Sequence, residues 1–503
     1  MDDTFVDLRG WLRAVEDFGE LRVVEGTHWK HELGGIADLM REERRVPAVI
    51  FDSIGEYPRG YRILSNPFHS VKRVALTIGL PLDVTQGEAA ALWRRRRKTL
   101  EPLPLRTVSE GPVLDHVQRG EDVNVLDFPS PIWRELDGGR YVGTADSVIT
   151  RDPEEGWLNS ASYRVMVVDE RHVTVYMDPG RHGRLHMERA FARGESFPAM
   201  IVVGQHPLLF LCSATNFIGG PGKANELEIA GAIRGEPVEV IEGEVTGLPF
   251  PAHAEIVLEV IARPGETHPE GPFAEFTGYY ASGTRREPLF EIQRIYHRTD
   301  PIILGDAPPT PQRGTTRSFG FFLGAQVWDV MEASGVPNVR GIASHAVSGG
   351  GSWVVISIKQ SYAGHAKQAA GVLAMSRAMG NSARYIIVVD EDIDPYDLGA
   401  VIWAISNRTD PQRDIDIIRD CVGSPLDPIL DPDAKERGDF LRSKAIINAC
   451  KPYAWKDRFP PVNEMTAELR DGLAEKWGWA IRGDAAPGSA VGTMAPAPSG
   501  IAG

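Results

Sequence analysis

Apolar residues recur with two different periods along the chain, and the period decides which element each stretch predicts. Residues 8–21 show the spacing of an amphipathic helix, in which apolar side chains return every three or four positions. Short apolar runs follow at 48–51 and 61–64, each bounded by turn residues, as strands are. Residues 1 to about 120 therefore predict a mixed α/β unit.

The middle of the chain is rich in short runs that predict strands. These runs fall at residues 147–150, 165–168, 173–176, 200–203, 208–212, 238–244, 256–261 and 290–296. Strands that follow one another at this spacing are typical of a barrel or a sandwich. A Pro-rich connection at 307–311 separates this segment from the next one.

Beyond that connection, strand and helix alternate. Residues 354–358 and 385–389 predict strands, and residues 365–379 and 398–405 predict helices. This order indicates a parallel sheet. A last helix is predicted at 463–477, far enough from these units to reach a neighbouring subunit.

The predicted fold class is α/β, divided into five segments. We expect an N-terminal α/β domain over 1–120, a β-barrel domain over 121–312 and a C-terminal α/β domain with a parallel sheet over 313–458. A C-terminal linker helix over 459–482 follows, and the tail 483–503, made of Ala, Gly, Pro and Ser, is expected to be disordered.

Composition narrows the class of protein. The chain has 503 residues, of which 42% are hydrophobic and 24% charged, as in ordinary globular proteins. No run approaches the ~20 apolar residues of a membrane span, and the acidic start does not resemble a signal peptide, so we expect a cytoplasmic protein. Three scattered cysteines, Cys212, Cys421 and Cys450, predict buried thiols rather than a disulfide framework or a zinc site.

The charge pattern bears on partners. A net charge of −15 argues against a nucleic-acid-binding surface, which would be basic. One basic run, residues 94–98 (Arg-Arg-Arg-Arg-Lys), predicts a solvated or subunit-facing helix surface rather than a phosphate-binding patch. An acidic protein still binds an anionic ligand where a pocket is locally basic, so a phosphate-bearing cofactor remains compatible with this charge.

Three polar residues of the middle segment match the ligand preferences of a divalent ion. Asn159 offers an amide oxygen, His182 an imidazole and Glu226 a carboxylate. Such a set suits Mn²⁺ or Mg²⁺ better than Zn²⁺. Spacing alone leaves an alternative open: a polar loop residue, a surface histidine and a glutamate favoured by the dipole of a helix start.

A second polar set is Arg164, Glu270 and Glu275. Both glutamates lie in the segment 269–275 (Pro-Glu-Gly-Pro-Phe-Ala-Glu), in which Gly and Pro exclude a regular helix or a central strand. Carboxylates on such a rigid loop suit proton transfer, and an arginine between them can bind a substrate carboxylate. From spacing alone, a solvated acidic turn and a strand arginine remain the alternative.

The spacing of these residues resembles that of the UbiD family. Asn159 stands five residues before Arg164, and His182 stands eighteen residues after it, where the family has its metal histidine. Glu226 opens a segment that runs into Gly-Ala, as the family's metal glutamate does, and Glu228 is a competitor by position.

Longer motifs resemble the same family. The most specific is segment 269–280, Pro-Glu-Gly-Pro-Phe-Ala-Glu-Phe-Thr-Gly-Tyr-Tyr, and segments 388–394 and 401–408 are two further landmarks. The matches follow one another in order from about residue 5 to 480.

The resemblance implies cofactors and roles. It implies a central split β-barrel that binds prenylated FMN, with Mn²⁺ (or Mg²⁺) held by Asn159, His182 and Glu226 and bridging to the flavin phosphate. It makes Arg164, Glu270 and Glu275 the catalytic set. The residues implied to bind the cofactor are Asn159, Ser162, Tyr163, Arg164, Arg181, His182, Glu226 and Lys367.

The chain departs from the commoner family pattern in places. Backbone carbonyls at 211–215 would bind the K⁺ ion that the resemblance allows, but the segment 219–222 looks inserted. Arg181 and Ala378 stand where relatives similar to ferulic acid decarboxylase have glutamine and lysine. His365 and Lys367 instead resemble a Gly-His-Ala-Lys segment of the hydroxybenzoate decarboxylase branch, with a surface lysine as the alternative for Lys367.

The resemblance implies a reversible, non-oxidative decarboxylase of an aromatic, heteroaromatic or α,β-unsaturated acid. Its partners would be that acid and CO₂, a flavin prenyltransferase that supplies the cofactor, and further copies of the chain, as a dimer or a hexamer. Segments 338–345 and the loop after Leu430 are expected to line the pocket. The alternatives are an FMN-dependent oxidoreductase of the split-barrel type and a non-catalytic cofactor-binding subunit.

Overall fold

The computed structural model describes residues 6–43, 45–215, 224–306, 318, 320–345, 351–376, 379 and 382–482. The chain divides into two compact units, Met1–Tyr453 and Ala454–Gly503. The predicted Pro-rich connection at 307–311, the segment 219–222, Ala378 and the tail from residue 483 lie outside the described residues.

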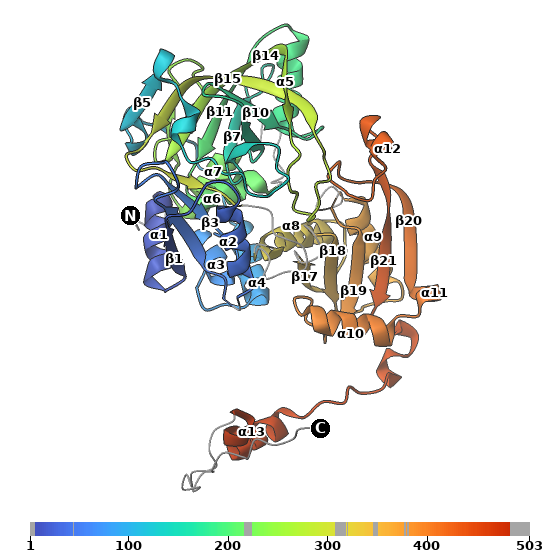
Figure 1. Cartoon of the computed structure of the whole chain (residues 1–503). Coiled ribbons are helices and arrows are strands. Elements are labelled where there is room, and N and C mark those ends of the chain that lie inside the picture. The colour runs from blue at the N-terminus through green and yellow to red at the C-terminus, as the bar shows by residue number, and fades with distance from the viewer. Residues whose placement is uncertain are drawn as a thin grey trace, which may run out of the picture. The chain divides into compact units, whose positions relative to one another are not determined.

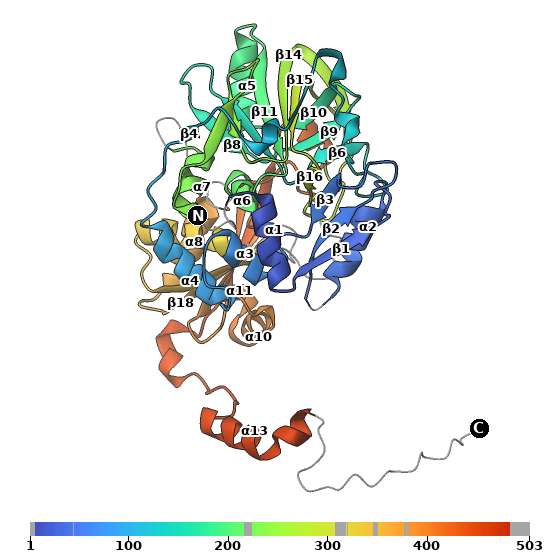
Figure 2. The ribbon, with the colours of Figure 1, turned by 90° about the vertical axis from the view of Figure 1, so that its left-hand side faces the viewer.

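A four-stranded sheet begins the first unit. Its order is β1 (Leu21–Glu25), β2 (Ala48–Asp52), β3 (Arg62–Ser65) and β16 (Ile302–Leu304), a strand that returns from much later in the chain. Successive side chains of β2 enter different cores: Ala48 and Ile50 pack with α1 (Leu8–Asp17), and Val49 and Phe51 with α2 (Glu32–Arg41). The two helices therefore cover opposite faces of the sheet (Figure 2). This confirms the predicted α/β unit.

A nine-stranded sheet forms the middle of the chain (Figure 1). Its strands lie in the order β6-β9-β10-β15-β14-β11-β7-β8, with β5 on β15, and adjacent strands are antiparallel. The bounds are β5 (His116–Arg119), β6 (Arg140–Gly143), β7 (Ser147–Arg151), β8 (Leu158–Ala161), β9 (Arg164–Val167), β10 (His172–Tyr176), β11 (Phe197–Val203), β14 (Ile256–Glu270) and β15 (Arg285–His297). Six of the eight predicted runs are strands of this curled sheet.

One predicted strand of the middle segment is wrong. Residues 208–212 belong to helix α6 (Pro207–Ala214), which starts with Pro207 at its first position and with the imidazole Nδ1 of His206 accepting from the Leu208 N–H at 3.0 Å. Every residue of α6 except Ala214 is buried. A helix that is buried all round has no polar face, so its sequence cannot be told from that of a buried strand.

Short elements complete the middle segment. The predicted strand at 238–244 becomes β12 (Glu239–Glu242) of a separate three-stranded sheet, with β13 (Pro249–Pro251) and β4 (Arg106–Thr107) as its neighbours. Helices α5 (His182–Ala192) and α7 (Glu226–Arg234) begin at two of the three predicted metal ligands. The remaining helices of the N-terminal part are α3 (Val71–Thr77) and α4 (Gln86–Arg97).

The C-terminal sheet has five strands in the order β17-β18-β19-β21-β20. The central strands β18 (Trp353–Ile358), β19 (Tyr385–Asp390) and β21 (Leu441–Ala449) are parallel, as predicted, whereas the edge strands β17 (Val339–His345) and β20 (Ile415–Val422) are antiparallel to their neighbours. Helix α9 (His365–Met375) packs on one face and α10 (Leu398–Arg408) on the other. Helix α9 ends four residues before the predicted position.

The basic run 94–98 forms the predicted solvated surface only in part, because Arg95 and Lys98 are exposed whereas the other three arginines contact neighbouring elements of the chain. Arg94 and Arg97 of α4 pair with Asp329 and Glu332 of α8 (Gly320–Ala333), with 2.9 Å between Arg97 Nη2 and Asp329 Oδ2. Arg96 donates to the Ile78 and Gly79 carbonyls, each at 2.7 Å. The opposite charges lie on a helix far away along the chain, so the sequence alone does not show these pairs.

The second unit contains the predicted last helix, α13 (Ala467–Arg482). Its exposed apolar residues Leu469, Leu473, Trp477 and Ile481 recur every four positions and so lie along one stripe. None of the helices in the described part of the chain has the length and apolarity for a bilayer crossing. The three cysteines are buried free thiols, as predicted.

Candidate active site

The predicted catalytic residues come from three neighbouring parts of the curled sheet. Arg164 is the first residue of β9, Glu270 is the last residue of β14, and Glu275 lies in the loop 271–284 between β14 and β15. Glu270 pairs with Arg285 and so belongs to a strand, but not to a central one, which agrees with the expectation that Gly and Pro exclude a central strand here. The pairing of β14 with β11 ends at Ala262, so this stretch is an edge, where proline is tolerated.

Arg164 joins the two glutamates. Its Nε and Nη2 donate to Glu270 Oε1 and Oε2, both at 2.8 Å, which is the bidentate arrangement of guanidinium and carboxylate. Its Nη1 forms an ion pair with Glu275. All three residues are buried, and Glu270 has no exposed surface. The residues that the sequence grouped are therefore in direct contact.

Neighbouring side chains hold this cluster in place. The Tyr141 hydroxyl donates to Glu270 Oε1 at 3.0 Å, and the Ser282 hydroxyl donates to Glu275 Oε1 at 3.1 Å. The Arg164 guanidinium lies over the ring of Tyr176, 4.2 Å from its centroid, and 5.3 Å from that of Phe273. Sequence reasoning missed Tyr141 and Ser282, because neither stands in a motif.

Burial tunes the charges of the cluster. Burial raises the pKa of Glu275, as does the charge of Asp178, while Arg164 and the Ser282 hydroxyl oppose the rise. Burial alone would lower the pKa of Arg164, but Glu275 and Glu270 raise it above its ordinary value. A permanently charged arginine therefore sits beside a carboxyl group that holds its proton more tightly than usual, which suits proton transfer.

A further buried acid lies beside this cluster. Glu287 of β15 faces His268 of β14 in the sheet register, two positions from Glu270. Burial raises the pKa of Glu287 to about 7, and the charge of Glu270 adds to the rise. The sequence had not singled out Glu287, because its relation to the cluster depends on the pairing of β14 with β15.

The predicted metal ligands are placed by a hairpin and two helix starts. Asn159 lies in β8, His182 opens α5 and Glu226 opens α7. Glu226 Oε2 accepts from the Ser160 N–H at 2.8 Å, which brings this carboxylate next to Asn159. The Gly183 N–H donates to the Tyr163 hydroxyl at 3.2 Å, which ties the start of α5 to the same segment.

Glycine makes that last contact possible. A Cβ atom on Gly183 would lie 3.0 Å from both the Tyr163 hydroxyl oxygen and a ring carbon, closer than side-chain atoms normally approach. The ring of His182 packs edge-on against Trp157, with 4.8 Å between centroids. The imidazole is therefore fixed by an aromatic neighbour beside the hairpin.

The donor set fits a hard divalent cation. Burial raises the pKa of Glu226 to about 7, with the Ser160 N–H and the charge of Arg181 acting against the rise. No three His, Cys, Asp or Glu side chains gather as metal ligands within the described ranges. The predicted set contains two residues of these types, His182 and Glu226. Its third member is the amide of Asn159, a ligand that Mn²⁺ and Mg²⁺ accept.

The other predicted cofactor residues lie in two different parts of the fold. Arg181 lies near Tyr163, with its guanidinium 5.9 Å from the ring centroid, and the Ser162 hydroxyl donates to buried Asp146 at 3.2 Å. Lys367 is not brought to them: it is exposed on α9 and pairs with Asp416 of β20 at 2.8 Å. The structure thus agrees with the alternative reading of Lys367 as a surface lysine.

The two segments expected to line the pocket have different surroundings. Helix α12 (Pro432–Glu436) follows the loop after Leu430, and its Lys435 donates to the Ala281 carbonyl of the loop 271–284 at 2.9 Å. The segment 338–345 forms β17, whose His345 bonds to the Pro395 carbonyl at 2.8 Å. Contact with the loop 271–284, which carries Glu275, is therefore made by the segment after Leu430.

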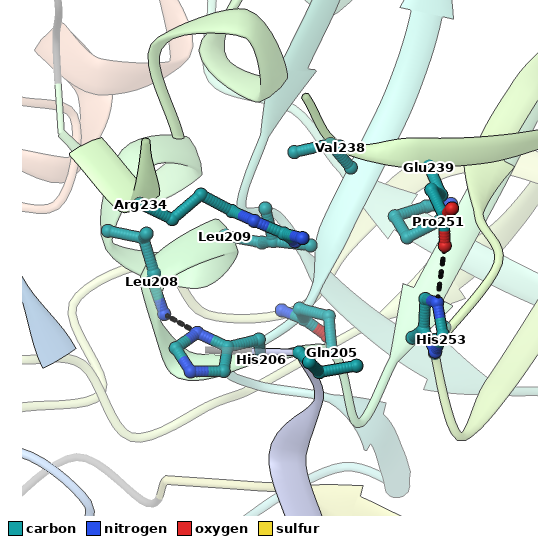
Figure 3. A pocket seen from close by; sticks show the side chains of 11 residues that line it. Gln205, His206, Leu208, Leu209, Arg234, Val238, Glu239, Pro251 and His253 are labelled. Carbon is teal, nitrogen blue, oxygen red and sulfur yellow. Dashed lines mark hydrogen bonds and ion pairs between the residues drawn. The ribbon is translucent and has the colours of Figure 1, made fainter. Parts of the chain in front are cut away.

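A separate small pocket lies between α6, α7, β12 and β13 (Figure 3). Arg234 extends across it, and His253 bonds to Glu239 at 2.7 Å on one side. Its enclosed volume of about 20 Å³ has room for one water molecule. This pocket is too small for an aromatic acid and contains none of the residues of the Arg164 cluster.

Family comparisons cover most of the chain. Three models match in order: the N-terminal domain of 3-octaprenyl-4-hydroxybenzoate carboxy-lyase over residues 12–91, its Rift-related domain over 106–311 and its C-terminal domain over 319–449. The chain belongs to the UbiD family. The recognition made from the motifs is confirmed, and with it the assignment as a carboxy-lyase.

Individual UbiD relatives agree with this assignment along their whole length. A phenolic acid decarboxylase of Bacillus subtilis is 31% identical, covering 90% of this chain and 94% of its own. A pyrrole-2-carboxylic acid decarboxylase of Pseudomonas aeruginosa is 30% identical, covering 89% and 92%. The UbiD-class enzyme HmfF from Pelotomaculum thermopropionicum, solved in complex with FMN, has a TM-score of 0.78 and 25% identity, covering 92% and 98%.

Proposed function

We propose that this UbiD-family chain decarboxylates an aromatic or heteroaromatic carboxylic acid with prenylated FMN as its cofactor. The observation that carries the proposal is the buried cluster of Arg164, Glu270 and Glu275, in which one carboxyl group has a raised pKa. The names of the relatives, which act on phenolic acids and on pyrrole-2-carboxylic acid, support this substrate class.

The cofactor proposal rests on the flavin complex of HmfF and on the donor set of this chain. Asn159, His182 and Glu226 would hold Mn²⁺ or Mg²⁺ beside the flavin phosphate, and Ser162, Tyr163 and Arg181 lie in the same neighbourhood. When bound, the flavin supplies the electron sink that loss of CO₂ from an sp² carbon requires and that side chains do not provide.

Arg164 would bind the substrate carboxylate. Its Nε and Nη2 are occupied by Glu270 and Ser282, whereas Nη1 has only Glu275 as a partner among the described residues. A carboxylate arriving at Nη1 would compete with Glu275 for that N–H. Glu270 stays bidentate and keeps the guanidinium oriented.

Glu275 would carry the proton. Its raised pKa favours the neutral carboxyl group, which can protonate the carbon that has lost CO₂. The same group, once ionised, can take a proton from an incoming C–H bond, so the cluster also supports carboxylation at high bicarbonate. This reverse reaction is a secondary part of the proposal.

The proposal extends to the assembly, the compartment and a K⁺ site. We infer a dimer formed through the C-terminal α/β segment and α13, with a hexamer as a larger assembly, in the cytoplasm. The K⁺ ion would bind near residues 211–215, where the Leu211 carbonyl already accepts from the Thr215 hydroxyl at 2.7 Å. The five-segment domain division also stays a prediction.

The proposal is tested on protein co-expressed with a flavin prenyltransferase. We expect mass spectrometry and absorbance to show prenylated FMN, and metal analysis to show Mn²⁺ or Mg²⁺. Glu275→Gln should keep that absorbance and lose at least about 100-fold of the turnover of aromatic acids. Glu266→Gln, which changes an exposed glutamate of β14, is the matched control and should keep both.

Two results would overturn the proposal. Plain FMN that supports NAD(P)H oxidation would assign the chain to flavin oxidoreductases. Colourless Glu275→Gln protein would make this glutamate a cofactor-binding residue rather than the proton carrier.

A further inference from the structure

A chain of buried polar contacts leads from Asp152 to the proposed metal ligand Asn159. The two closest atoms of Asp152 and His186, Oδ2 and Nε2, are 3.6 Å apart. His186 Nδ1 is 3.1 Å from the Thr150 hydroxyl, which is 3.4 Å from Asn159 Nδ2. Each of the four residues is at most 3% exposed.

The fold brings these residues together from two elements. Thr150 and Asn159 are directly paired across the hairpin of β7 and β8. His186 stands four residues after His182 on α5, so both imidazoles project from one face of that helix. The ring of Trp157 packs edge-on against both, at 4.8 Å and 5.4 Å between centroids. The polar chain thus connects the two elements that carry Asn159 and His182.

The acid at the start of this chain is held ionised. Burial alone would raise the pKa of Asp152, but the N–H groups of Glu154 and Glu155, at 2.8 and 3.2 Å, lower it, together with His186 and Arg189. A carboxylate beside Nε2 favours the His186 tautomer that carries its proton on Nε2. Nδ1 is then the acceptor for the Thr150 hydroxyl.

The direction of these bonds decides how Asn159 is turned. A hydroxyl group has one proton to donate, and Thr150 donates it to Nδ1, so its oxygen accepts from Asn159 Nδ2. An amide has its nitrogen and its oxygen on opposite sides. With the nitrogen directed at Thr150, Oδ1 points away from it, and only this oxygen can bind a cation.

We propose that Asp152, His186 and Thr150 are positioning residues that fix the amide of Asn159 as an oxygen ligand of the divalent cation. The inference rests on the metal site of the proposed function. This positioning role differs from a role in packing alone, because it depends on whether the nitrogen or the oxygen of the Asn159 amide faces Thr150. Partners of metal ligands typically change metal affinity by 10–100-fold when they are removed.

The test is Mn²⁺ titration of the flavin-free chain, with unbound Mn²⁺ measured by its EPR signal. Thr150→Val removes the hydroxyl at nearly constant volume, and we expect about tenfold weaker Mn²⁺ binding. Thr150→Ser keeps the hydroxyl and should keep the affinity. An unchanged affinity in Thr150→Val would overturn the inference.

A second background separates orientation from packing. In Asn159→Asp the ligand is a carboxylate with two equivalent oxygens, so its orientation no longer matters. Adding Thr150→Val to Asn159→Asp should then change Mn²⁺ affinity by less than about twofold, against about tenfold in the parent chain. Equal losses in both backgrounds would show that Thr150 acts only through packing.

A further variant covers the case in which Thr150→Val does not fold. Asp152→Asn places an amide donor beside His186 Nε2, so the imidazole proton moves to Nδ1. Nδ1 then donates to the Thr150 oxygen, and the Thr150 hydroxyl donates to Asn159, which must turn its amide oxygen toward Thr150. We expect the same tenfold loss, and an unchanged affinity would overturn the inference. If Glu226→Gln also leaves Mn²⁺ binding unchanged, the metal site itself is wrong; if Glu226→Gln weakens binding, only the positioning role is wrong.

Discussion

At the scale of single residues, the two glutamates of the cluster differ in how firmly they are held. Glu270 accepts two hydrogen bonds from Arg164 and one from Tyr141 at the end of a strand. Glu275 lies on a loop and accepts from Arg164 and Ser282. Glu275 is therefore the less firmly held of the two. Burial and the negative charge of Asp178 raise its pKa, and a raised pKa favours Glu275 as the proton donor.

The pH dependence of turnover follows from this assignment. Because the donor must be protonated, kcat should fall as the pH rises through the pKa of Glu275, which burial raises. Asp178→Asn removes the neighbouring negative charge that also raises this pKa. The alkaline limb of the kcat profile should therefore move to lower pH.

A matched substitution checks that effect. Asp169→Asn changes an acid at the far end of β10, where Asp169 pairs with His172 at 2.8 Å, and should leave the profile in place. If the alkaline limb stays unchanged in Asp178→Asn, Glu275 is not the group that titrates.

At the scale of elements, the contact between α4 and α8 shows how a basic run is absorbed by the fold. Asp329 lies 2.9 Å from Arg97 and 3.5 Å from Arg94, and less than a quarter of each of these three side chains is exposed. The run 94–98 was expected on a solvated or subunit-facing helix surface, because a sequence does not show that Asp329 and Glu332 face it. Pairing inside one chain thus explains the local concentration of positive charge.

Removing the shared acid should loosen this contact. In Asp329→Asn Arg97 loses its acidic partner and Arg94 keeps Glu332. We expect a loss of about 1 kcal/mol in the free energy of unfolding, because these ion pairs are only partly buried. Differential scanning calorimetry should show a melting temperature lower by about 2 °C. Arg95→Met, at an exposed position of the same helix, is the control and should leave it unchanged; an equal decrease in both variants would contradict the prediction.

At the scale of the whole molecule, the loop 271–284 is joined to the C-terminal segment. Lys435 of α12 donates to the Ala281 carbonyl across 154 residues of sequence. Burial lowers the pKa of Lys435, with the charges of Asp427 and Glu275 acting against that shift. The loop that carries Glu275 is therefore held by a residue outside the curled sheet.

Loss of this contact should free the loop. Lys435→Met removes the donor and keeps much of the apolar stem, so we expect faster amide exchange in residues 271–284 and a several-fold lower kcat. Hydrogen–deuterium exchange and steady-state kinetics measure the two effects. Lys367→Met, at an exposed lysine of α9, should change neither, and normal exchange in Lys435→Met would show that the loop does not depend on this contact.

The sequence by itself determined which stretches form strands and helices wherever a local period was visible. Strands β7, β9, β10, β11, β18 and β19 and helices α1, α9 and α10 were predicted within a few residues of their bounds. The motifs also named Arg164, Glu270 and Glu275, which the structure joins. Periodicity and motif are properties of neighbouring residues, so they can be read without the fold.

Only the tertiary structure decided the features that depend on contacts between distant residues. Residues 208–212 lie in a helix that is buried on nearly every side, and Glu270 ends a strand in a stretch that no longer pairs with β11. The supports of the site, such as Tyr141 donating to Glu270 across 129 residues, are equally invisible in the sequence. These contacts arise from long-range packing, which a local pattern of polar and apolar residues does not encode.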